Sequence, residues 1–407
     1  MPKFKTMDEF DFKDKTVLLR VDINSPLNKE TKEIIDDTRI REHSETIREL
    51  SDRKAKTVVL AHQGRPGGED FTSLRLHAKR IGEILDRPVF FTEDIFGEEA
   101  KNAIRSLKRG DILVLNNVRM WEDEQAKKIP EEFAQTEFIQ SLAPLADIFV
   151  NDAFAAAHRG HASMVGFTEV LPSAAGRLME RELNALNKVK EAEEKPCLYV
   201  LGGAKAEDTA NITEYVLGSG KADYVLTGGV VANLCLYSVG IDIGVPNLEL
   251  LKKEKVTELS PKIKELSEKY EGKLIIPTDV AISKDGEREE VSVSELPTND
   301  PIFDIGKNTY KFYADLIAQA KIIFLNGPMG VFERDEFSTG TKEVFEAIAK
   351  SDAYKVAGGG HTIGAIEKLG IKEGFSYIST GGGVLMRFLM GKTLPAVAAL
   401  EKAADLH

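Results

Sequence analysis

The chain alternates short apolar runs with longer stretches in which apolar residues recur every three or four positions. The short runs are typical of buried strands, and the periodic stretches are typical of amphipathic helices. Strands that alternate with helices indicate βαβ units and hence parallel sheets. In the first half, strands are predicted at 16–21, 57–61, 112–115 and 146–150, and helices at 36–50, 73–85 and 130–142.

The second half repeats this pattern, and a periodic stretch separates the two halves. Strands are predicted at 197–201, 224–227, 274–276, 322–325, 354–356 and 377–378, with a helix at 253–270. Between Pro172 and Pro196, residues 173–194 carry apolar side chains at helical spacing, which predicts a connecting helix. We therefore expect an α/β protein with two doubly wound, Rossmann-like parallel-sheet domains, 1–172 and 195–392, that face each other across a cleft and are joined by this helix.

Length, charge and cysteine content narrow the class of protein. A chain of 407 residues exceeds one ordinary core. A net charge of -12 argues against a nucleic-acid partner, because such binding depends on basic surface. Neither a signal-type apolar segment nor a membrane-length apolar run is present, so we expect a cytoplasmic protein without a membrane partner. Cys197 and Cys235 lie in apolar contexts and are expected to be reduced core residues.

Side chains that bind anions follow the strands of the first half. Because ligands of open α/β sheets bind at the carboxyl ends of the strands, the residues after each strand are the candidates. They comprise Asp22, Asn24, His62 and four arginines, Arg39, Arg65, Arg119 and Arg159. Guanidinium groups bind phosphate and carboxylate through paired hydrogen bonds. Four of them at one rim predict a site for a small polyanion such as a phosphorylated acid.

Glycines follow the strands of the second half instead. They occur in the segments 202–205, 227–229, 326–330, 358–362 and 379–383. Glycine lets backbone amides approach phosphate, and the N-terminus of a following helix adds its dipole. One such turn alone is usually only a tight turn, but five on one face predict a surface for nucleotide phosphates.

An arginine-rich rim and a glycine-rich rim together favour phosphoryl transfer between two bound substrates. The transfer requires alignment of both substrates and exclusion of water, with cations such as Arg39 and Lys205 beside the transferred group. No Walker motif, dinucleotide fingerprint or protein-kinase signature is present. The residues alone thus predict a phosphotransferase and leave its substrate open.

The chain resembles the phosphoglycerate kinase family over roughly residues 15–393. The motifs RVDIN, AHQGRP, NDAFAAAHRGHAS, LGGAKAED, NGPMGVFE, GGGHT and STGGG occur in the family's order. The resemblance implies reversible transfer between 1,3-bisphosphoglycerate and ADP to give 3-phosphoglycerate and ATP, with Mg²⁺ on the nucleotide. It also implies that residues 393–407 return to the first domain. The sequence does not give the oligomeric state, and we expect a monomer rather than a dimer.

The resemblance assigns roles residue by residue. The phosphoglycerate would contact Asp22, Ile23, Asn24, Arg39, His62, Gln63, Gly64, Arg65, Arg119 and Arg159. The nucleotide would contact Gly203, Lys205, Gly228, Asn326, Glu333, Gly359, Gly360, His361 and Thr362. The groups closest to the transferred phosphoryl would be Arg39, Lys205, Gly359 and Gly382.

Two positions depart from the pattern of most family members. Thr209 stands where a second lysine is usual, and His361 stands where an aspartate usually binds the magnesium ion. Both departures resemble the archaeal branch of the family. The magnesium ligands are therefore open, with Asp208 and Asp279 as candidates because magnesium prefers oxygen.

Two other classes of function remain as alternatives. A nicotinamide-dependent oxidoreductase would need the dinucleotide fingerprint that the chain lacks. A nucleotide-gated binding protein without catalysis is kept open by Thr209 and His361.

Overall fold

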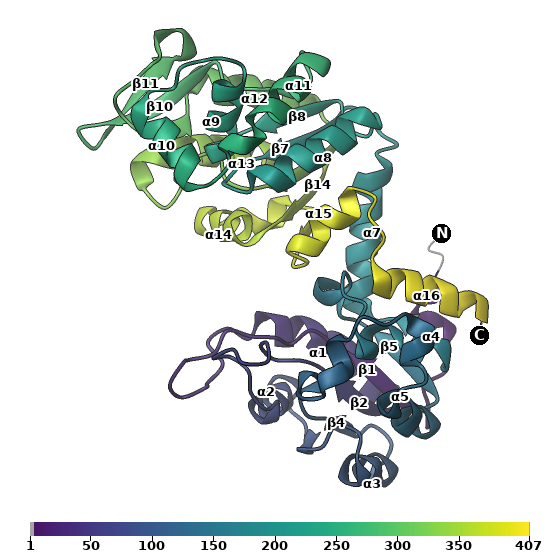
Figure 1. Cartoon of the computed structure of the whole chain (residues 1–407). Coiled ribbons are helices and arrows are strands. Elements are labelled where there is room, and N and C mark those ends of the chain that lie inside the picture. The colour runs from purple at the N-terminus through teal and green to yellow at the C-terminus, as the bar shows by residue number, and fades with distance from the viewer. Residues whose placement is uncertain (1–3, 407) are drawn as a thin grey trace. The chain divides into compact units, whose positions relative to one another are not determined.

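The first six strands pair in parallel and are covered by helices. The computed structural model describes residues 4–406, and these divide into two units, one extending to Leu183 and resumed from Thr393, the other Asn184–Lys392. The strands of the first unit are β1 (Thr16–Arg20), β2 (Lys56–Leu60), β3 (Phe90–Phe91), β4 (Ile112–Val114), β5 (Ile148–Asn151) and β6 (Ser173–Ala175), in the spatial order β3-β4-β2-β1-β5-β6 (Figure 1).

Helices of the first unit pack on this sheet. They are α1 (Thr38–Asp52), α2 (Arg75–Leu85), α3 (Glu98–Ser106), α4 (Pro130–Phe133), α5 (Glu137–Leu142), α6 (Ala162–Val165) and α16 (Pro395–Leu406). Helix α7 (Arg177–Glu191) begins in the first unit and ends in the second. Helix α16 packs beside α6 and β6, and Lys402 pairs with Glu169 at 2.7 Å.

The second unit contains another parallel sheet of six strands. It is formed by β7 (Cys197–Leu201), β8 (Tyr224–Thr227), β9 (Leu274–Ile275), β13 (Ile322–Asn326), β14 (Tyr354–Gly358) and β15 (Tyr377–Ser379), in the order β15-β14-β13-β7-β8-β9. The helices are α8 (Ala206–Gly218), α9 (Gly229–Ser238), α10 (Val245–Lys253), α11 (Ser260–Lys269), α12 (Lys307–Gln319), α13 (Thr339–Lys350), α14 (Gly360–Leu369) and α15 (Gly383–Leu389). The predicted fold class, two parallel-sheet α/β domains, is confirmed.

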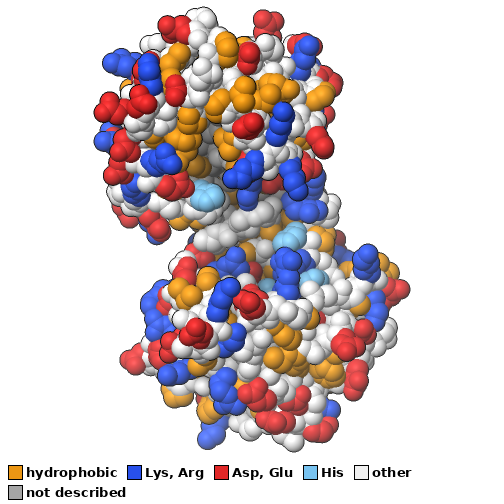
Figure 2. All heavy atoms as spheres, turned by 60° about the vertical axis from the view of Figure 1, so that its left-hand side comes forward, with side chains coloured by type: hydrophobic (Ala, Val, Ile, Leu, Met, Phe, Trp, Pro, Cys, Tyr) orange, Lys and Arg blue, Asp and Glu red, His pale blue; other side chains and the backbone are white. Residues whose placement is uncertain are grey.

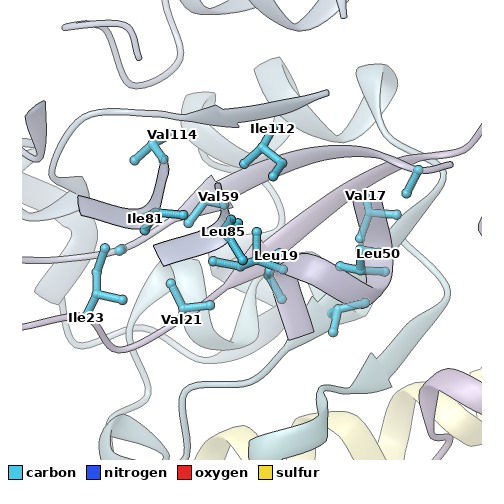
Figure 3. Close-up of a cluster of buried hydrophobic side chains, with 14 of the residues drawn as sticks. Val17, Leu19, Val21, Ile23, Leu50, Val59, Ile81, Leu85, Ile112 and Val114 are labelled. Atoms are coloured by element: carbon cyan, nitrogen blue, oxygen red, sulfur yellow. The ribbon is translucent and has the colours of Figure 1, made fainter. Parts of the chain in front are cut away.

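Strand β1 shows how the apolar pattern builds the core. Alternate residues of a strand share one face of the sheet, and Val17 and Leu19 lie in a buried cluster with Leu50 of α1 and Leu85 of α2 (Figure 3). Leu18, on the other face, is also fully buried. Because helices cover both faces, the strand reads as a continuous apolar run instead of an alternating one.

Three predicted elements are corrected by the structure. The helix at 130–142 is two helices, because Thr136 is extended (φ -72°, ψ 154°) and starts α5. The helix at 253–270 is divided at Lys255, whose φ of 56° ends α10, and α11 starts again with a proline in its first turn. The first residues of the segment 173–194 form the strand β6, which pairs with β5, so that the connecting helix begins only at Arg177.

A small antiparallel sheet was not predicted. It contains β10 (Asp279–Lys284), β11 (Glu287–Ser292) and β12 (Ile302–Ile305) in the order β11-β10-β12. Asp285 and Gly286 join β10 to β11 with φ of 51° and 90°, the left-handed pair that a two-residue hairpin requires. The Asp-Gly pair is a sequence signal for such a hairpin. The strand that follows it, β11, is mostly polar and lacks the apolar pattern by which strands are recognised, so the hairpin was missed.

Among residues 4–406, the longest apolar helices fall short of what a lipid bilayer requires for a crossing.

Replacement of Leu19 by alanine tests the core of the first sheet. The side chain is fully buried, so Leu19→Ala should lower the free energy of unfolding by about 2–5 kcal/mol through lost burial and a cavity. Guanidinium unfolding followed by Trp121 fluorescence measures this unit, since Trp121 is the single tryptophan and lies in it. Leu76→Ala on α2, where the side chain is 39% exposed, is the control and should change stability far less.

Candidate active site

Arg20, the last residue of β1, is the buried centre of the polar groups at the strand ends. Its side chain is 1% exposed. Its Nε donates to Ser163 Oγ at 2.8 Å, one Nη group donates to the carbonyl of Val21, and the other contacts His62 Nδ1 at 3.1 Å. The sequence places Arg20 directly before the predicted site residues, but its apolar strand neighbours gave no reason to include it among them.

Glu124 is a buried carboxylate that is linked to Arg20 through Ser163. Both its oxygens accept hydrogen bonds from Ser163, one from the hydroxyl at 2.6 Å and one from the backbone N–H at 2.9 Å. Burial raises the pKa of Glu124, although the charge of Arg20 opposes this effect. Ser163 thus links a buried cation to a buried carboxylate that no sequence motif had indicated.

The contact with Arg20 determines the tautomer of His62. Arginine can only donate, and the contact of Nδ1 with Arg20 (3.1 Å) is shorter than that of Nε2 with Arg159 (3.4 Å), so we assign Nδ1 as the acceptor and the ring proton to Nε2. Burial lowers the pKa of His62 well below its usual value, and Arg20, Arg119 and Arg159 lower it further against the effect of Asp22. His62 is therefore a neutral ring whose Nε2–H points to the side on which Arg159 Nη1 lies, 3.4 Å away.

Arg119 and Arg159 lie near Arg20 and His62, and neither forms an ion pair with a carboxylate among residues 4–406. Burial lowers the pKa of Arg119 to about 10, with Arg159 and Arg20 as further causes, and burial also lowers the pKa of Arg159. Arg119 donates to the carbonyl of Gly64, and its buried Nε has no hydrogen-bond partner among residues 4–406. Figure 2 shows basic and histidine side chains close together on one face of this unit. Such a cluster is suited to an anion of more than one charge.

Asp22 is the carboxylate that faces the arginines. Burial opposes its ionisation, but the positive charge around it, including the guanidinium groups of Arg39 and Arg20, outweighs burial and lowers its pKa to about 2. Arg39, near the start of α1, pairs with Asp22 at 3.2 Å, and its side chain is 40% exposed. Asp22 thus holds Arg39 at the rim while part of the guanidinium group stays accessible.

A tight loop presents Arg65 and Asn24. Gly64 has φ of 68° and a Cβ there would meet the backbone of Asp70 at 2.6 Å, so only glycine fits. Its N–H donates to Asn24 Oδ1 at 2.7 Å. The amide of Gln63 is fully buried and is used within the protein, accepting from the N–H of Ser25 and donating to its carbonyl. Arg65 is exposed, and Ile23 packs in the core.

In the second unit, glycines bring three strand ends together. Gly202 N–H donates to the carbonyl of Asn326 and Gly203 N–H to that of Pro328, both at 2.9 Å. A Cβ at Gly228 would meet Met329 at 2.6 Å. The ends of β7, β8 and β13 are therefore as close as their backbones allow.

Helix N-termini follow two further strands. Gly359, with φ of 95°, caps α14, and Gly360 and His361 form its first turn. Thr362 Oγ1 accepts from the N–H of Gly327 at 2.7 Å, and Asn326 Nδ2 donates to the carbonyl of Gly358. Gly382, before α15, is exposed, and a Cβ there would meet no atom within 4 Å.

A cavity of about 280 Å³ opens beside these turns. Its wall is mostly apolar, and it is lined by Gly203, Ala204, Gly229, Val230, Leu250, Val280, Ile302, Met329, Glu333 and His361 among others. Glu333 is exposed, so its carboxylate is available at the cavity. An apolar wall with an exposed carboxylate available at the cavity suits a ring system that carries hydroxyl groups.

The start of α8 carries a lysine and an aspartate that are candidates for contacts with phosphate and metal. Lys205 is the exposed N-cap residue of α8, whereas Thr209 one turn later is 5% exposed. Asp208, in the first turn of α8, is half-buried. Asp279 is not available to a metal, because its carboxylate accepts from the N–H groups of Asn308 and Thr309, both at 2.8 Å.

The described residues provide few ligands for a metal ion. Among residues 4–406, His, Cys, Asp and Glu side chains nowhere gather in a group of three that could hold one. His361 at the start of α14 is exposed and offers nitrogen, which magnesium disfavours. Of the two carboxylates that the sequence offers as magnesium ligands, that of Asp208 is the more exposed.

Two parallel-sheet units, one with clustered guanidinium groups and one with glycine turns at helix N-termini, define a phosphotransferase. The chain belongs to the phosphoglycerate kinase family, whose model matches residues 7–392. The sequence-based identification of a kinase that generates ATP is thereby confirmed.

Full-length relatives support the assignment. The phosphoglycerate kinase of Methanothermus fervidus is 49% identical over 403 residues, which covers 99% of this chain and 98% of the relative. That of Methanosarcina mazei is 46% identical, with 99% and 96% covered. The crystal structure of the Pyrococcus horikoshii enzyme superposes with a TM-score of 0.88 at 42% identity, covering 99% of this chain and all of that one. The Coxiella burnetii structure gives 0.84 at 33% identity, with 98% of this chain and all of that one covered.

Replacement of Ser163 tests the link between Arg20 and Glu124. Ser163→Ala removes the hydroxyl that accepts from one and donates to the other, and it leaves two buried charged groups each short of a hydrogen bond. The free energy of unfolding should fall by about 1–3 kcal/mol, measured by guanidinium unfolding with Trp121 fluorescence. Ser106→Ala, an exposed serine bonded to its own helix, is the control and should leave stability nearly unchanged.

Proposed function

We propose that the arginine cluster of the first unit binds 3-phosphoglycerate or 1,3-bisphosphoglycerate and that the glycine turns of the second unit bind ADP or ATP. The observation that carries the proposal is the excess of positive charge at the strand ends of the first unit. Two carboxylates, Asp22 and Glu124, face a larger set of cations, Arg20, Arg39, Arg65, Arg119 and Arg159. A ligand with a phosphate and a carboxyl or acyl phosphate balances such a cluster.

Within this site, each group has a role that follows from its protonation. Arg119 and Arg159 donate to the anionic groups, and the neutral His62 donates through Nε2–H. Asp22 stays ionised, so it accepts from the substrate hydroxyl and keeps Arg39 in place. Further contacts to the substrate come from the loop residues Asn24, Gly64 and Arg65. Ile23 and Gln63 hold this loop in place, Ile23 in the core and Gln63 through its hydrogen bonds to the backbone of Ser25.

In the proposed reaction, a terminal oxygen of ADP forms a bond to the phosphorus of the acyl phosphate. The bond from phosphorus to the acyl oxygen breaks, and the carboxylate of 3-phosphoglycerate leaves with those electrons. Charge spreads over the transferred group, so Arg39 on one side and Lys205 with the amides of Gly359 and Gly382 on the other stabilise it.

The cavity beside α9 and the turns around α14 take the nucleotide. The base packs on the apolar wall, and Glu333 accepts from the ribose hydroxyls. The amides near Gly203, Gly228 and Gly360, together with His361 and Thr362, surround the phosphates, with Asn326 holding the turn before α14. When bound with the nucleotide, Mg²⁺ would supply charge neutralisation, and Asp208 is the protein carboxylate that would help to hold it.

Each of the two substrates is assigned to one domain of the chain. We propose residues 1–172, completed by 393–407, as the phosphoglycerate domain, 195–392 as the nucleotide domain and the segment between them as the hinge. Closure of the two domains aligns the substrates and excludes water. One chain carries both sites, so a monomer suffices, and the metabolites of the reaction suit a cytoplasmic enzyme.

A coupled assay that detects ATP formed from 1,3-bisphosphoglycerate and ADP tests the proposal. We expect turnover that depends on magnesium. Turnover no higher than the uncatalysed background would leave the nucleotide-gated binding protein as the better description.

Arg39→Ala should lower kcat by about a hundredfold to a thousandfold, since it removes one charge that stabilises the transferred group. The dissociation constant for ADP, measured by calorimetry, should stay within about twofold because Arg39 belongs to the other unit. Arg41→Ala is the matched control, an exposed arginine on the same helix that pairs with Asp37. An equal loss of turnover and nucleotide affinity in Arg39→Ala would contradict the assignment.

Glu333→Gln should raise KM for ADP by about three- to tenfold, because hydrogen bonds from ribose hydroxyls to a charged group become bonds to a neutral one. Steady-state kinetics at saturating 1,3-bisphosphoglycerate measures the effect. The control is Glu336→Gln on the same exposed loop. Unchanged KM for ADP in Glu333→Gln would remove Glu333 from the nucleotide site.

A further inference from the structure

His43 lies one helical turn beyond Arg39 on α1 and is 2% exposed. Residues four apart share one face of a helix, so both side chains approach the end of β1. Arg39 pairs with the carboxylate of Asp22, and His43 Nε2 lies 3.1 Å from the backbone N–H of the same Asp22. Two side chains of α1 thus hold the backbone and the side chain of one site residue.

The other ring nitrogen of His43 contacts a different segment. His43 Nδ1 lies 2.8 Å from Asp152 Oδ2, and Asp152 is fully buried. A backbone N–H can only donate, so Nε2 must accept, and the ring proton lies on Nδ1 and is donated to Asp152. The imidazole therefore accepts a hydrogen bond from the backbone of Asp22 on one side and donates one to the carboxylate of Asp152 on the other.

Asp152 uses its second oxygen to cap the helix that continues into the second unit. Its Oδ1 accepts from the N–H of Leu178 at 2.8 Å and of Met179 at 3.2 Å, in the first turn of α7. A Cβ at Gly176 would lie 2.3 Å from this oxygen, so glycine is required for the approach. The N–H of Arg177 donates to Thr46 Oγ1, also on α1. The N-terminus of α7 is thus fastened to the same face of α1 that holds Asp22.

We propose that His43 is a positioning residue that links the phosphoglycerate site to the N-terminus of α7. Its acceptor nitrogen holds the strand-end loop at Asp22 in the substrate-binding form, and its donor nitrogen holds Asp152 against α7. The proposal rests on the proposed function of this site. Nothing else in the described residues joins the backbone of Asp22 to the cap of α7 through a single side chain.

Two substitutions separate the two halves of the link. In Gln the amide reaches the place of Nε2, so His43→Gln keeps an acceptor for the Asp22 N–H and loses the donor to Asp152. In Asn the amide reaches the place of Nδ1, so His43→Asn keeps the donor to Asp152 and loses the acceptor. Ser44→Ala is the matched control, a buried neighbour whose hydroxyl bonds only to its own helix through Ile40.

Steady-state kinetics with 3-phosphoglycerate and ATP gives the readout. His43→Asn should raise KM for 3-phosphoglycerate by about tenfold with kcat nearly unchanged, and His43→Gln should lower kcat by about tenfold with that KM nearly unchanged. KM for ATP should be unchanged in both variants, and Ser44→Ala should match the wild type. Wild-type constants in both variants, or the same loss of kcat and KM in both, would overturn the proposal.

Imidazole ¹⁵N spectra of the wild-type protein keep the proposal testable if a variant does not fold. The His43 signal should show the proton on Nδ1 and should shift on addition of 3-phosphoglycerate but not of ADP alone. A proton on Nε2, or a signal that 3-phosphoglycerate does not move while the wild type turns over, would overturn the role of His43. A wild type that neither binds nor turns over 3-phosphoglycerate would overturn the proposed function, and this inference with it.

Discussion

Like-charge repulsion among guanidinium groups is the constraint on which the first unit depends. Burial lowers the pKa of Arg20, Arg119 and Arg159, and neighbouring guanidinium groups lower each further, Arg159 acting on both Arg20 and Arg119. Charges buried this closely are tolerated only where opposite charges or hydrogen bonds offset them. Asp22 and Glu124 provide the offset, each from a different segment, and they leave the net charge of the cluster positive. An anion-binding site follows from this incomplete balance inside a chain whose net charge is -12.

In the proposed function, the second unit binds phosphate by different means. It uses few charged side chains and instead brings backbone amides and helix N-termini close to one another. Glycine is required at the contacts, as at Gly202, where a Cβ would lie 2.1 Å from the carbonyl of Pro328. Amides have no repulsion of the kind that arginines have, so these turns pack densely without buried counterions. The apolar cavity is the surface that we propose for the uncharged part of the nucleotide.

Helix α1 connects several of these features because its positions repeat every three or four residues. Arg39 and His43 reach Asp22, Thr46 reaches the start of α7, and Glu49 pairs with Arg177 at 2.8 Å. A rigid helix that touches both a ligand-binding residue and the start of α7 makes the position of one depend on the position of the other. Burial of His43 and Asp152 keeps water from competing for these hydrogen bonds.

The sequence by itself determined the order of strands and helices, the two parallel sheets and the chemistry of each rim. These follow from local signals, because strand and helix periods, and the residues just after a strand, are contiguous in the chain. The helix breaks at Thr136 and Lys255, the strand β6 and the hairpin at Asp285-Gly286 were exceptions; in the hairpin, the Asp-Gly turn is present in the sequence but β11 is too polar to be recognised as a strand.

Only the tertiary structure decided which charged residues are buried together. Glu124 lies 39 residues before Ser163, and His43 lies 109 residues before Asp152, so no spacing in the sequence indicates either contact. The same holds for Gln63, which the motif includes but whose amide holds the loop. Side-chain partners depend on how separate βαβ units pack, and that packing brings together residues that are far apart in the chain.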